Sequence, residues 1–363
     1  MLEVKNQNDI QAYSVFDMMK EGGHEQVVFC KDKDTGLKAI IAIHNTTLGP
    51  ALGGTRMSKY DSEQDALRLS RGMTYKAAVT SLKLGGGKAV IIGDSKKDKT
   101  ESLFRSYGRF VESLNGVYIT AEYVGTSMQD MEYVSMETKH VTGIPEAMGG
   151  GGDPSPVTAY GVYMGMKAAA KQRWGNESLE GKKVVVQGLG HVGTYLVEYL
   201  IKEGAKVFGT DIHADHVDNA VKKFGITVVA PDAIYDVDAD IYAPCALGAT
   251  LNTDTISRLR CSIVAGSANN QFANEAEHSR MLSEKGILYA PDFLINAGGL
   301  INVYSELNGF DRKKAMEKTE HIYRVTLDIF ERAIKENITT DIAAKRAAEE
   351  KLKAADKEKA AHV

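Results

Sequence analysis

The stretch that decides the fold is Val184-Val185-Val186-Gln187-Gly188-Leu189-Gly190-His191-Val192-Gly193, followed by Asp211. An apolar run, a GxGxxG turn and a helical pattern, in that order, are typical of the strand, turn and helix that bind a dinucleotide. Gly188 permits the tight turn, Gly190 lets backbone N–H groups approach a pyrophosphate, and Gly193 lets the helix lie close to the strand. The pattern therefore predicts a Rossmann-type nucleotide-binding unit in the middle of the chain.

An acidic residue completes this unit. Asp211 directly follows the apolar run 205–210, about 20 residues beyond the turn, where a carboxylate can bind the ribose hydroxyls of an adenosine. The charge of Asp211 would repel a 2′-phosphate, so the sequence favours NAD over NADP as cofactor. The intervening segment has the apolar periodicity of a helix, so strand, turn, helix and acid are all present.

Composition excludes several classes of protein. The 363 residues are 43% hydrophobic and 25% charged, as expected for a globular protein of two domains. A net charge of −4, with basic and acidic residues interspersed, gives no reason to expect a nucleic-acid partner. The first residues lack a signal-peptide core, and no run reaches the roughly 18 apolar residues that span a bilayer. We therefore expect a cytoplasmic protein without a membrane partner.

The cysteines predict neither disulfides nor a metal site. Cys30, Cys245 and Cys261 are an odd number at wide spacing, which fits neither a disulfide framework nor a metal-binding motif. We interpret all three as buried thiols and expect no metal ion.

The residues ahead of the nucleotide unit should form an α/β domain of their own, at 1–145. Two strand-like runs flank the turn Asp34-Thr35-Gly36 and predict a hairpin. Strand and helix patterns then alternate, which is typical of an α/β fold. The expected strands are 25–31, 37–44, 89–93 and 117–120, and the expected helices are 62–76 and 101–114.

A glycine-rich segment, 149–156, separates this domain from the second and predicts a hinge. Ser155 is expected to cap a long helix that ends at Trp174. Further strands at 227–230, 241–244 and 263–265 would complete a doubly wound sheet in a nucleotide-binding domain at 146–337. The helix-forming tail at 338–363 would pack back on the first domain or support assembly.

Two lysines of the first domain are candidates for chemistry. Three glycines precede Lys88, so a small substrate and the backbone could approach its ammonium group closely. If Lys88 is buried near Lys76, desolvation and like-charge repulsion would lower its pKa and make it a general base. The segment is not an ATP-binding Walker A loop, because Leu82 and Ala89 occupy positions that require glycine and a hydroxyl residue.

Nearly the whole chain resembles the Glu/Leu/Phe/Val amino-acid dehydrogenase family, and within it the leucine, phenylalanine and valine dehydrogenases. The segments that carry this resemblance are 48–57, 70–76, 85–94, 153–161, 188–193, 243–248, 266–271 and 296–299. The resemblance implies two α/β domains, an N-terminal domain for substrate and oligomerisation and a Rossmann domain for NAD. It also implies a homo-oligomer that reversibly deaminates small apolar L-amino acids to 2-oxo acids and ammonia.

The resemblance assigns roles to individual residues. Lys88 would transfer a proton, Lys76 would hold the substrate α-carboxylate, and Thr158 would contact the nicotinamide amide. Asn270 would orient substrate and cofactor. The expected substrate residues are Leu52, Gly53, Lys76, Ala121, Asn270, Leu300 and Val303. The expected cofactor residues are Thr158, Gly188, Leu189, Gly190, His191, Val192, Gly193, Asp211, Ala246, Ala268, Asn269 and Asn270.

Leu52 indicates the kind of substrate. Glutamate dehydrogenases of the family have a lysine here, which pairs with the distal carboxylate of glutamate. A leucine would leave that carboxylate buried and unpaired, so the sequence excludes glutamate and favours an apolar side chain. Leucine, valine or, with repacking, an aromatic ring would fit.

Tyr123 departs from the family pattern. The family has an aspartate at this position, which is thought to shuttle protons as water adds to the imine. Tyrosine is bulkier and is normally neutral at pH 7. Three interpretations follow: a disabled or engineered variant, a homologue with altered chemistry, or a working enzyme in which Tyr123 or Glu122 supplies the proton. We favour the first, with weak residual activity.

Two other functions stay open at this point. A homologue that binds NAD without turnover would also explain Tyr123. A hydroxy-acid dehydrogenase would need a histidine paired with a carboxylate, and none of the nine histidines lies in such a motif. Phenylalanine, valine and tryptophan are alternative substrates to leucine.

Overall fold

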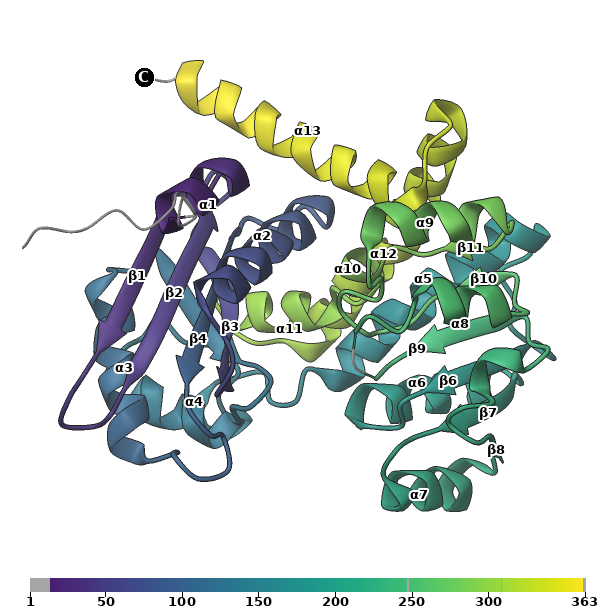
Figure 1. The fold of residues 1–363 in the computed structure, drawn as a ribbon, viewed down its shortest axis with the longest axis horizontal. Coiled ribbons are helices and arrows are strands. Elements are labelled where there is room, and N and C mark those ends of the chain that lie inside the picture. Colours follow the sequence, from purple (N-terminus) through teal and green to yellow (C-terminus); the bar gives the residue numbers. More distant parts are fainter. Residues whose placement is uncertain (1–13, 247, 308, 362–363) are drawn as a thin grey trace, which may run out of the picture.

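Figure 1 shows two α/β units side by side along the long axis of the molecule. The coordinates are a computed structural model and describe residues 14–246, 248–307 and 309–361. Outside this range lie the first 13 residues, where the sequence shows no signal-peptide pattern, Leu247 of the 243–248 motif, Asn308 and the last two residues.

The first unit is built on a five-stranded mixed sheet in the order β1-β2-β4-β3-β5. Its strands are β1 (Gln26–Lys31), β2 (Lys38–Asn45), β3 (Ala51–Ser58), β4 (Gly85–Ile92) and β5 (Tyr118–Glu122). The predicted hairpin is confirmed, since β1 and β2 pair in antiparallel register with Gln26 opposite Ile43. Strand β4 is antiparallel to β2 and parallel to β3, which in turn is parallel to β5.

Four helices accompany this sheet. They are α1 (Val15–Gly22), α2 (Glu63–Val79), α3 (Glu101–Ser113) and α4 (Met128–Ser135). Helix α2 begins after Ser62, whose N–H and hydroxyl both donate to Asp65 Oδ2 at 3.1 Å and so tie the chain to the first turn of the helix. The two predicted helices are therefore confirmed within a few residues.

The second unit is a doubly wound sheet of six parallel strands in the order β11-β10-β9-β6-β7-β8. The strands are β6 (Lys183–Gln187), β7 (Lys206–Thr210), β8 (Thr227–Val228), β9 (Ile241–Pro244), β10 (Ile263–Val264) and β11 (Leu288–Tyr289). Gln187 pairs with Thr210 on one side and Pro244 on the other. The carboxyl ends of these strands therefore meet at one edge, beside the GxGxxG turn, where ligands bind in such sheets.

The helices of the second unit and tail are listed here with two short 3₁₀ turns. They are η1 (Glu146–Met148), α5 (Ser155–Trp174), α6 (His191–Lys202), α7 (Ala214–Phe224), η2 (Ile234–Asp236), α8 (Thr253–Arg258), α9 (Glu275–Glu284), α10 (Asp292–Ile295), α11 (Gly298–Glu306), α12 (Arg312–Glu336) and α13 (Thr340–Ala361). One detail corrects the sequence analysis, because Ser155 is the first residue of α5 and not its cap. The Ser155 N–H instead donates to Asp153 Oδ1 at 2.9 Å.

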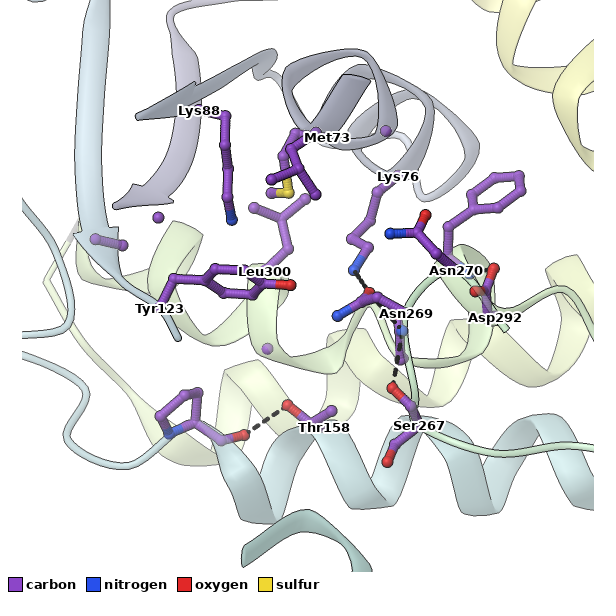
Figure 2. A pocket seen from close by; sticks show the side chains of 18 of the residues that line it. Met73, Lys76, Lys88, Tyr123, Thr158, Ser267, Asn269, Asn270, Asp292 and Leu300 are labelled. Atoms are coloured by element: carbon purple, nitrogen blue, oxygen red, sulfur yellow. Dashed lines mark hydrogen bonds between the residues drawn. The ribbon is translucent and has the colours of Figure 1, made fainter. Parts of the chain in front are cut away.

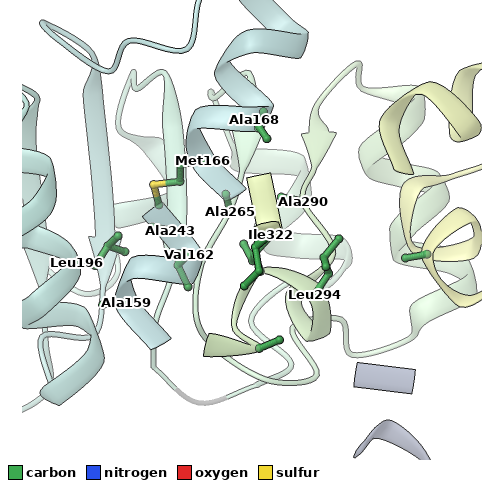
Figure 3. Packing of buried hydrophobic residues seen from close by; sticks show 14 of the residues in the cluster. Ala159, Val162, Met166, Ala168, Leu196, Ala243, Ala265, Ala290, Leu294 and Ile322 are labelled. Atoms are coloured by element: carbon green, nitrogen blue, oxygen red, sulfur yellow. The ribbon is translucent and has the colours of Figure 1, made fainter. Parts of the chain in front are cut away.

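Helix α5 is the packing centre of the second unit. Its buried face is mostly small residues, which allow neighbouring helices to approach closely. Figure 3 shows Ala159 and Val162 of α5 among Leu196 of α6, Leu294 of α10 and Ile322 of α12. The first turn of α5 points at the cleft between the units, so this packing fixes one wall of the site.

Helix α13 connects the two units over the top of the molecule in Figure 1. The chain leaves α12 through Asn337, which adopts the left-handed conformation (φ 52°) and so ends that helix. Helix α13 then packs on α2, where Lys351 Nζ donates to Val79 O at 3.0 Å and the Tyr75 hydroxyl donates to Glu349 Oε1 at 3.1 Å. The tail thus contacts the helix that carries Lys76.

The cysteines only partly match the sequence analysis. All three are free thiols, but only Cys30 is buried, whereas Cys245 and Cys261 are partly exposed. The prediction of three buried thiols is therefore wrong for two of them, which lie just outside the ends of β9 and β10. Within the described part of the chain, no helix has the length and apolarity required to cross a bilayer.

Candidate active site

A cleft of about 840 Å³ lies between the two units. The first unit contributes α2, β4 and the end of β5, and the second contributes the start of α5, the loop 267–273 and the α10–α11 segment. Figure 2 shows side chains from both units converging on this space. The cleft is large enough for a small substrate beside part of a cofactor.

Lys88 lies at the inner end of the cleft on β4. Its side chain is only 2% exposed, and its Nζ lies 3.2 Å from the centre of the Tyr123 ring. Burial lowers the pKa of Lys88 well below its ordinary value, and the positive charges of Lys76 and Arg56 add to that shift. A lysine whose pKa is lowered in this way can act as a general base, as expected from the sequence.

The three glycines before Lys88 make room for protein rather than for a ligand. A Cβ on Gly86 would lie 2.5 Å from Ser70 O of α2 and even closer to Thr74, and a Cβ on Gly87 would lie 2.6 Å from the Tyr118 ring. The structure therefore corrects the expectation that these glycines open a path for substrate. Gly86 lets α2 lie directly on β4, which fixes the relative positions of Lys76 and Lys88.

Lys76 extends from α2 across the cleft to the second unit. Its Nζ donates a hydrogen bond to Asn269 Oδ1 at 3.2 Å. Burial lowers the pKa of Lys76 to about 8, and the nearby carboxylate of Asp292 opposes the shift. Asp292 is itself held by the backbone N–H groups of Gln271 and Phe293. A second lysine that is only partly charged near pH 8 thus faces the same space as Lys88.

Tyr123 lies on the turn after β5, and two basic side chains lie near its ring. Its N–H donates to Thr126 Oγ1 at 2.9 Å, and that hydroxyl donates in turn to Thr55 O at 2.8 Å, so the turn is tied to β3. Arg56 Cζ lies 5.5 Å from the ring centre, further away than Lys88 Nζ. The electron-rich ring face therefore stabilises positive charge, while the hydroxyl points toward the middle of the cleft in Figure 2.

Buried apolar side chains form the wall beside Lys88. Leu52 is 1% exposed, and Ala121, Leu300 and Val303 are also buried while lining the cleft. No charged group belongs to this wall, so a distal carboxylate placed against it would lose its water without gaining a partner. The wall suits an aliphatic or aromatic side chain.

Two carboxyl groups flank the crossing between the units at Gly143. The Gly143 N–H donates to Glu306 Oε2 at 2.8 Å, and a Cβ on Gly143 would lie 3.5 Å from Glu122 Cγ. Burial raises the pKa of Glu306 to about 7, and the charge of Glu122 adds to the shift. Burial, with the charge of Asp153, also raises the pKa of Glu122. Glu122 and Gly143 also line the cleft, so protonation here would change the charge at the edge of the cleft where the two units meet.

The GxGxxG turn fits a dinucleotide. Gly188 has φ 101°, and a Cβ there would lie 2.7 Å from Ala246 N, so only glycine fits. A Cβ on Gly190 would meet nothing within 4 Å, and α6 begins there without a side-chain cap. The first N–H groups of α6 thus face open space, as an approaching pyrophosphate requires.

Asp211 lies beside this turn. Its Oδ2 accepts the Leu189 N–H at 2.7 Å, and its Oδ1 accepts the His213 N–H at 2.9 Å. Burial opposes ionisation, but these two backbone donors together with His216 lower the pKa of Asp211. The residue is therefore a fixed carboxylate at the position expected for ribose binding.

Comparison with known proteins gives the family. The model of the "Glu/Leu/Phe/Val dehydrogenase, dimerisation domain" matches residues 24–140, and that of "Glutamate/Leucine/Phenylalanine/Valine dehydrogenase" matches residues 149–211 and 211–360. The chain belongs to this dehydrogenase family. It is an amino-acid dehydrogenase, and the resemblance found in the sequence is confirmed.

Individual relatives match over nearly their whole length. Leucine dehydrogenase from Thermoactinomyces intermedius is 58% identical over 342 residues, which are 93% of each chain. Leucine dehydrogenase from Geobacillus stearothermophilus is 55% identical over the same shares. The crystal structure of L-tryptophan dehydrogenase from Nostoc punctiforme matches with a TM-score of 0.82 and 49% identity, over 94% of this chain and 99% of that one.

The structure brings most of the residues predicted from the family resemblance to one cleft. Those that line it are Leu52, Lys76, Lys88, Ala121, Tyr123, Thr158, His191, Val192, Asn269, Asn270, Leu300 and Val303. The others lie behind or beside it: Gly53, Gly188, Leu189, Gly190, Gly193, Asp211, Ala246 and Ala268. Gly53 lies on β3 against the backbone of Gly87 and so supports β4.

Two polar residues of the cleft escaped the sequence analysis. Asn296 donates through Nδ2 to Asn269 Oδ1 at 2.9 Å and so orients the amide that Lys76 contacts. Asp292 provides the negative charge nearest Lys76. The segment 296–299 belongs to the family resemblance and could have drawn attention to Asn296, whereas no local pattern indicates Asp292.

Proposed function

We propose that this chain catalyses the reversible, NAD-linked oxidative deamination of leucine-like L-amino acids, with slow turnover because of Tyr123. The observation that carries the proposal is the hydrogen bond from Lys76 of the first unit to Asn269 of the second. That bond closes a space in which Lys88 and an apolar wall meet the edge of the nucleotide-binding sheet. The names of the leucine dehydrogenases that match the chain support leucine as a substrate.

The residues divide the work between binding and proton transfer. Lys76 would hold the α-carboxylate, and the wall around Leu52 and Leu300 would hold the side chain. Lys88, with its lowered pKa, would take the proton from the substrate ammonium. The nicotinamide, when bound, supplies the acceptor for hydride from the α-carbon.

The turn at 188–193 and Asp211 would hold the cofactor. The first N–H groups of α6 are placed for the pyrophosphate and the Asp211 carboxylate for the ribose, which favours NAD over NADP. Thr158 on the first turn of α5 would face the nicotinamide amide. Asn269 and Asn270 would lie between cofactor and substrate.

Assembly is part of the proposal. The family model that matches residues 24–140 is described as a dimerisation domain. We expect a symmetric homo-oligomer formed through the first unit.

The test is NADH formation at alkaline pH with L-leucine, L-valine, L-phenylalanine and L-tryptophan. The chain and its Tyr123→Asp variant are compared, and we expect the variant to turn over leucine on the order of 10²-fold faster. NADPH formation under the same conditions should be much lower. If neither protein oxidises any of the four amino acids, although both bind NAD, the proposed function is wrong and the chain is a binding protein.

A further inference from the structure

The proposed reaction joins two steps that make different demands on the protein. Hydride exchange at the α-carbon interconverts an amino acid and its imine, and it requires an anchored carboxylate and a substrate held in one orientation. Addition of water to the imine, with release of ammonia, also requires a group that accepts a proton from that water. The two demands can be examined separately in this cleft.

The cleft meets the first demand. Lys76 offers a cation for the carboxylate, and the buried wall around Leu52 and Leu300 holds an apolar group. Lys88 lies on the same unit as Lys76, and their relative position is fixed where α2 lies against Gly86 of β4. A substrate held between them would therefore keep one orientation.

The side of Lys88 that faces Tyr123 does not meet the second demand. Lys88 Nζ lies 3.2 Å from the centre of the Tyr123 ring. The face of the ring therefore covers the side of Lys88 on which an acid or base would have to bind the attacking water. An aromatic face holds a cation but accepts no proton from water. Among the described residues, Lys88 Nζ makes no hydrogen bond or ion pair with a carboxylate; Asp61, the acid whose charge acts on Lys88, pairs instead with Arg56 at 3.5 Å.

The carboxyl next to Tyr123 in the sequence does not take over this task. Glu122 lines the same cleft, but its Cγ lies beside Gly143, whose N–H donates to Glu306. The charges that act on Glu122 are those of Asp153, His191 and Asp130, and not that of Lys88. The Glu122 carboxyl therefore faces another acid at the crossing between the units. Asp292, another acid of the cleft, is held by backbone N–H groups and lies near Lys76.

We propose that this site reduces preformed imines whose nitrogen stays bonded in the product, above all cyclic 2-imino carboxylates, faster than it aminates open-chain 2-oxo acids. The inference rests on the proposed function, because it uses the same carboxylate anchor and the same cofactor. It differs in the step it omits: no water adds and no ammonia leaves. Tyr123 is then the residue that selects between the two reactions.

The step balances without a further reactant. Hydride from the reduced nicotinamide forms a new C–H bond at C2 of the cyclic imine. The C=N π electrons become a lone pair on nitrogen, which takes one proton, and the product is a cyclic secondary amino acid. Lys88 supplies that proton as an ammonium and regains it from solvent, while the ring face of Tyr123 stabilises its charged form.

A cyclic substrate also fits the walls. Its carboxylate lies on the imine carbon and reaches Lys76, as that of an open-chain amino acid would. Its ring methylenes carry no charge and can pack against the buried side chains of Ala121, Leu300 and Val303. The ring nitrogen of the cyclic substrate carries no free amino group, but it needs only the proton that Lys88 supplies.

The experiment compares two substrates of NADH oxidation: the six-membered cyclic imine Δ1-piperideine-2-carboxylate, and 4-methyl-2-oxopentanoate with ammonia. In the unmodified chain, kcat/KM for the imine should exceed that for the oxo acid at least about tenfold. Tyr123→Asp should raise amination on the order of 10²-fold and so abolish the preference for the imine. Tyr123→Phe keeps the ring face without the hydroxyl and should still favour the imine over the oxo acid.

A binding measurement provides a readout other than turnover. The saturated cyclic amino acid L-pipecolate is titrated calorimetrically into the NADH-loaded chain, in which it cannot react, with Lys76→Ala as control. We expect binding that the control loses. Failure of the imine to react or of pipecolate to bind, while Tyr123→Asp turns over leucine, overturns the inference and leaves the proposed function standing.

Other outcomes also decide. If Tyr123→Asp raises both reactions equally, the ring hinders hydride transfer and the inference is wrong. Formation of a 2-hydroxy acid from the oxo acid would show that Tyr123 serves as an acid for carbonyl reduction, which also overturns it. If no variant reacts with leucine, oxo acid or imine, the proposed function fails and the inference fails with it.

Discussion

Replacing Gly86 by alanine tests whether close contact between α2 and β4 sets the geometry of the two lysines. The added Cβ would lie 2.5 Å from Ser70 O, where an ordinary contact needs 3.4 Å, so α2 must move outward by about 0.9 Å at this point alone. Contact with Thr74 is tighter still. Such overpacking costs about 1–3 kcal/mol, which lowers the melting temperature by roughly 2–10 °C for a domain of this size.

The same movement separates Lys76 from Lys88. A misplacement of about 1 Å can reduce turnover on the order of 10²-fold. The assay is thermal unfolding together with leucine-dependent NADH formation, measured in the Tyr123→Asp background so that a loss is visible. We expect both the melting temperature and kcat to fall.

Gly72→Ala is the matched control on the same helix. A Cβ on Gly72 would meet nothing within 4 Å, and Gly72 lies in the interior of α2. Alanine there should stabilise the helix by about 0.5–1 kcal/mol. If Gly86→Ala melts at the parent temperature and keeps its turnover, α2 does not lie against β4 as described, and the argument about the two lysines fails.

Four further predictions follow from burial and charge. Leu52→Lys should lower kcat/KM for leucine on the order of 10²-fold and allow NADH formation with glutamate, because the wall gains a cation. Lys88→Met should abolish turnover yet raise the melting temperature at pH 7, because the lowered pKa of Lys88 makes the buried lysine destabilise the native state. This gain in melting temperature should shrink toward pH 10, where the lysine of the unfolded chain also loses its proton. Glu306→Gln should become progressively more stable than the parent between about pH 4.5 and pH 7, because the raised pKa of Glu306 makes the parent lose stability as pH rises through that window. Calorimetry of substrate binding at pH 8, in buffers of different ionisation enthalpy, should show uptake of about half a proton, because Lys76 has a pKa of about 8 and must be charged to hold a carboxylate.

Features encoded in short stretches of sequence could be predicted. The GxGxxG turn needs only the conformational freedom of Gly188 and a following helix, and both are local properties. The hairpin of β1 and β2 and the helix starting after Ser62 likewise follow from turn and capping residues. Where local chemistry alone determines an element, its predicted position agrees with the structure within a few residues.

Features that depend on packing between distant segments could not be predicted. Lys76 and Asn269 are 193 positions apart, and their contact depends on how the two units are placed. Asn270 was expected to take the orienting role, although Asn269 is the residue that accepts a hydrogen bond from Lys76. The packing role of the glycines before Lys88 could not be predicted for the same reason, because the atoms around them come from α2 and from other strands of the sheet.

The charges of the cleft explain why Tyr123 and the two lysines must be considered together. Lys76, Lys88 and Arg56 place three basic groups around a partly buried space, and burial makes their charged forms costly. An aspartate in place of Tyr123 would offset this charge and also provide a base. The ring offsets part of the charge through its face but provides no base. We therefore expect stabilising the charge of Lys88 and activating water to be separable tasks, of which this chain retains only the first.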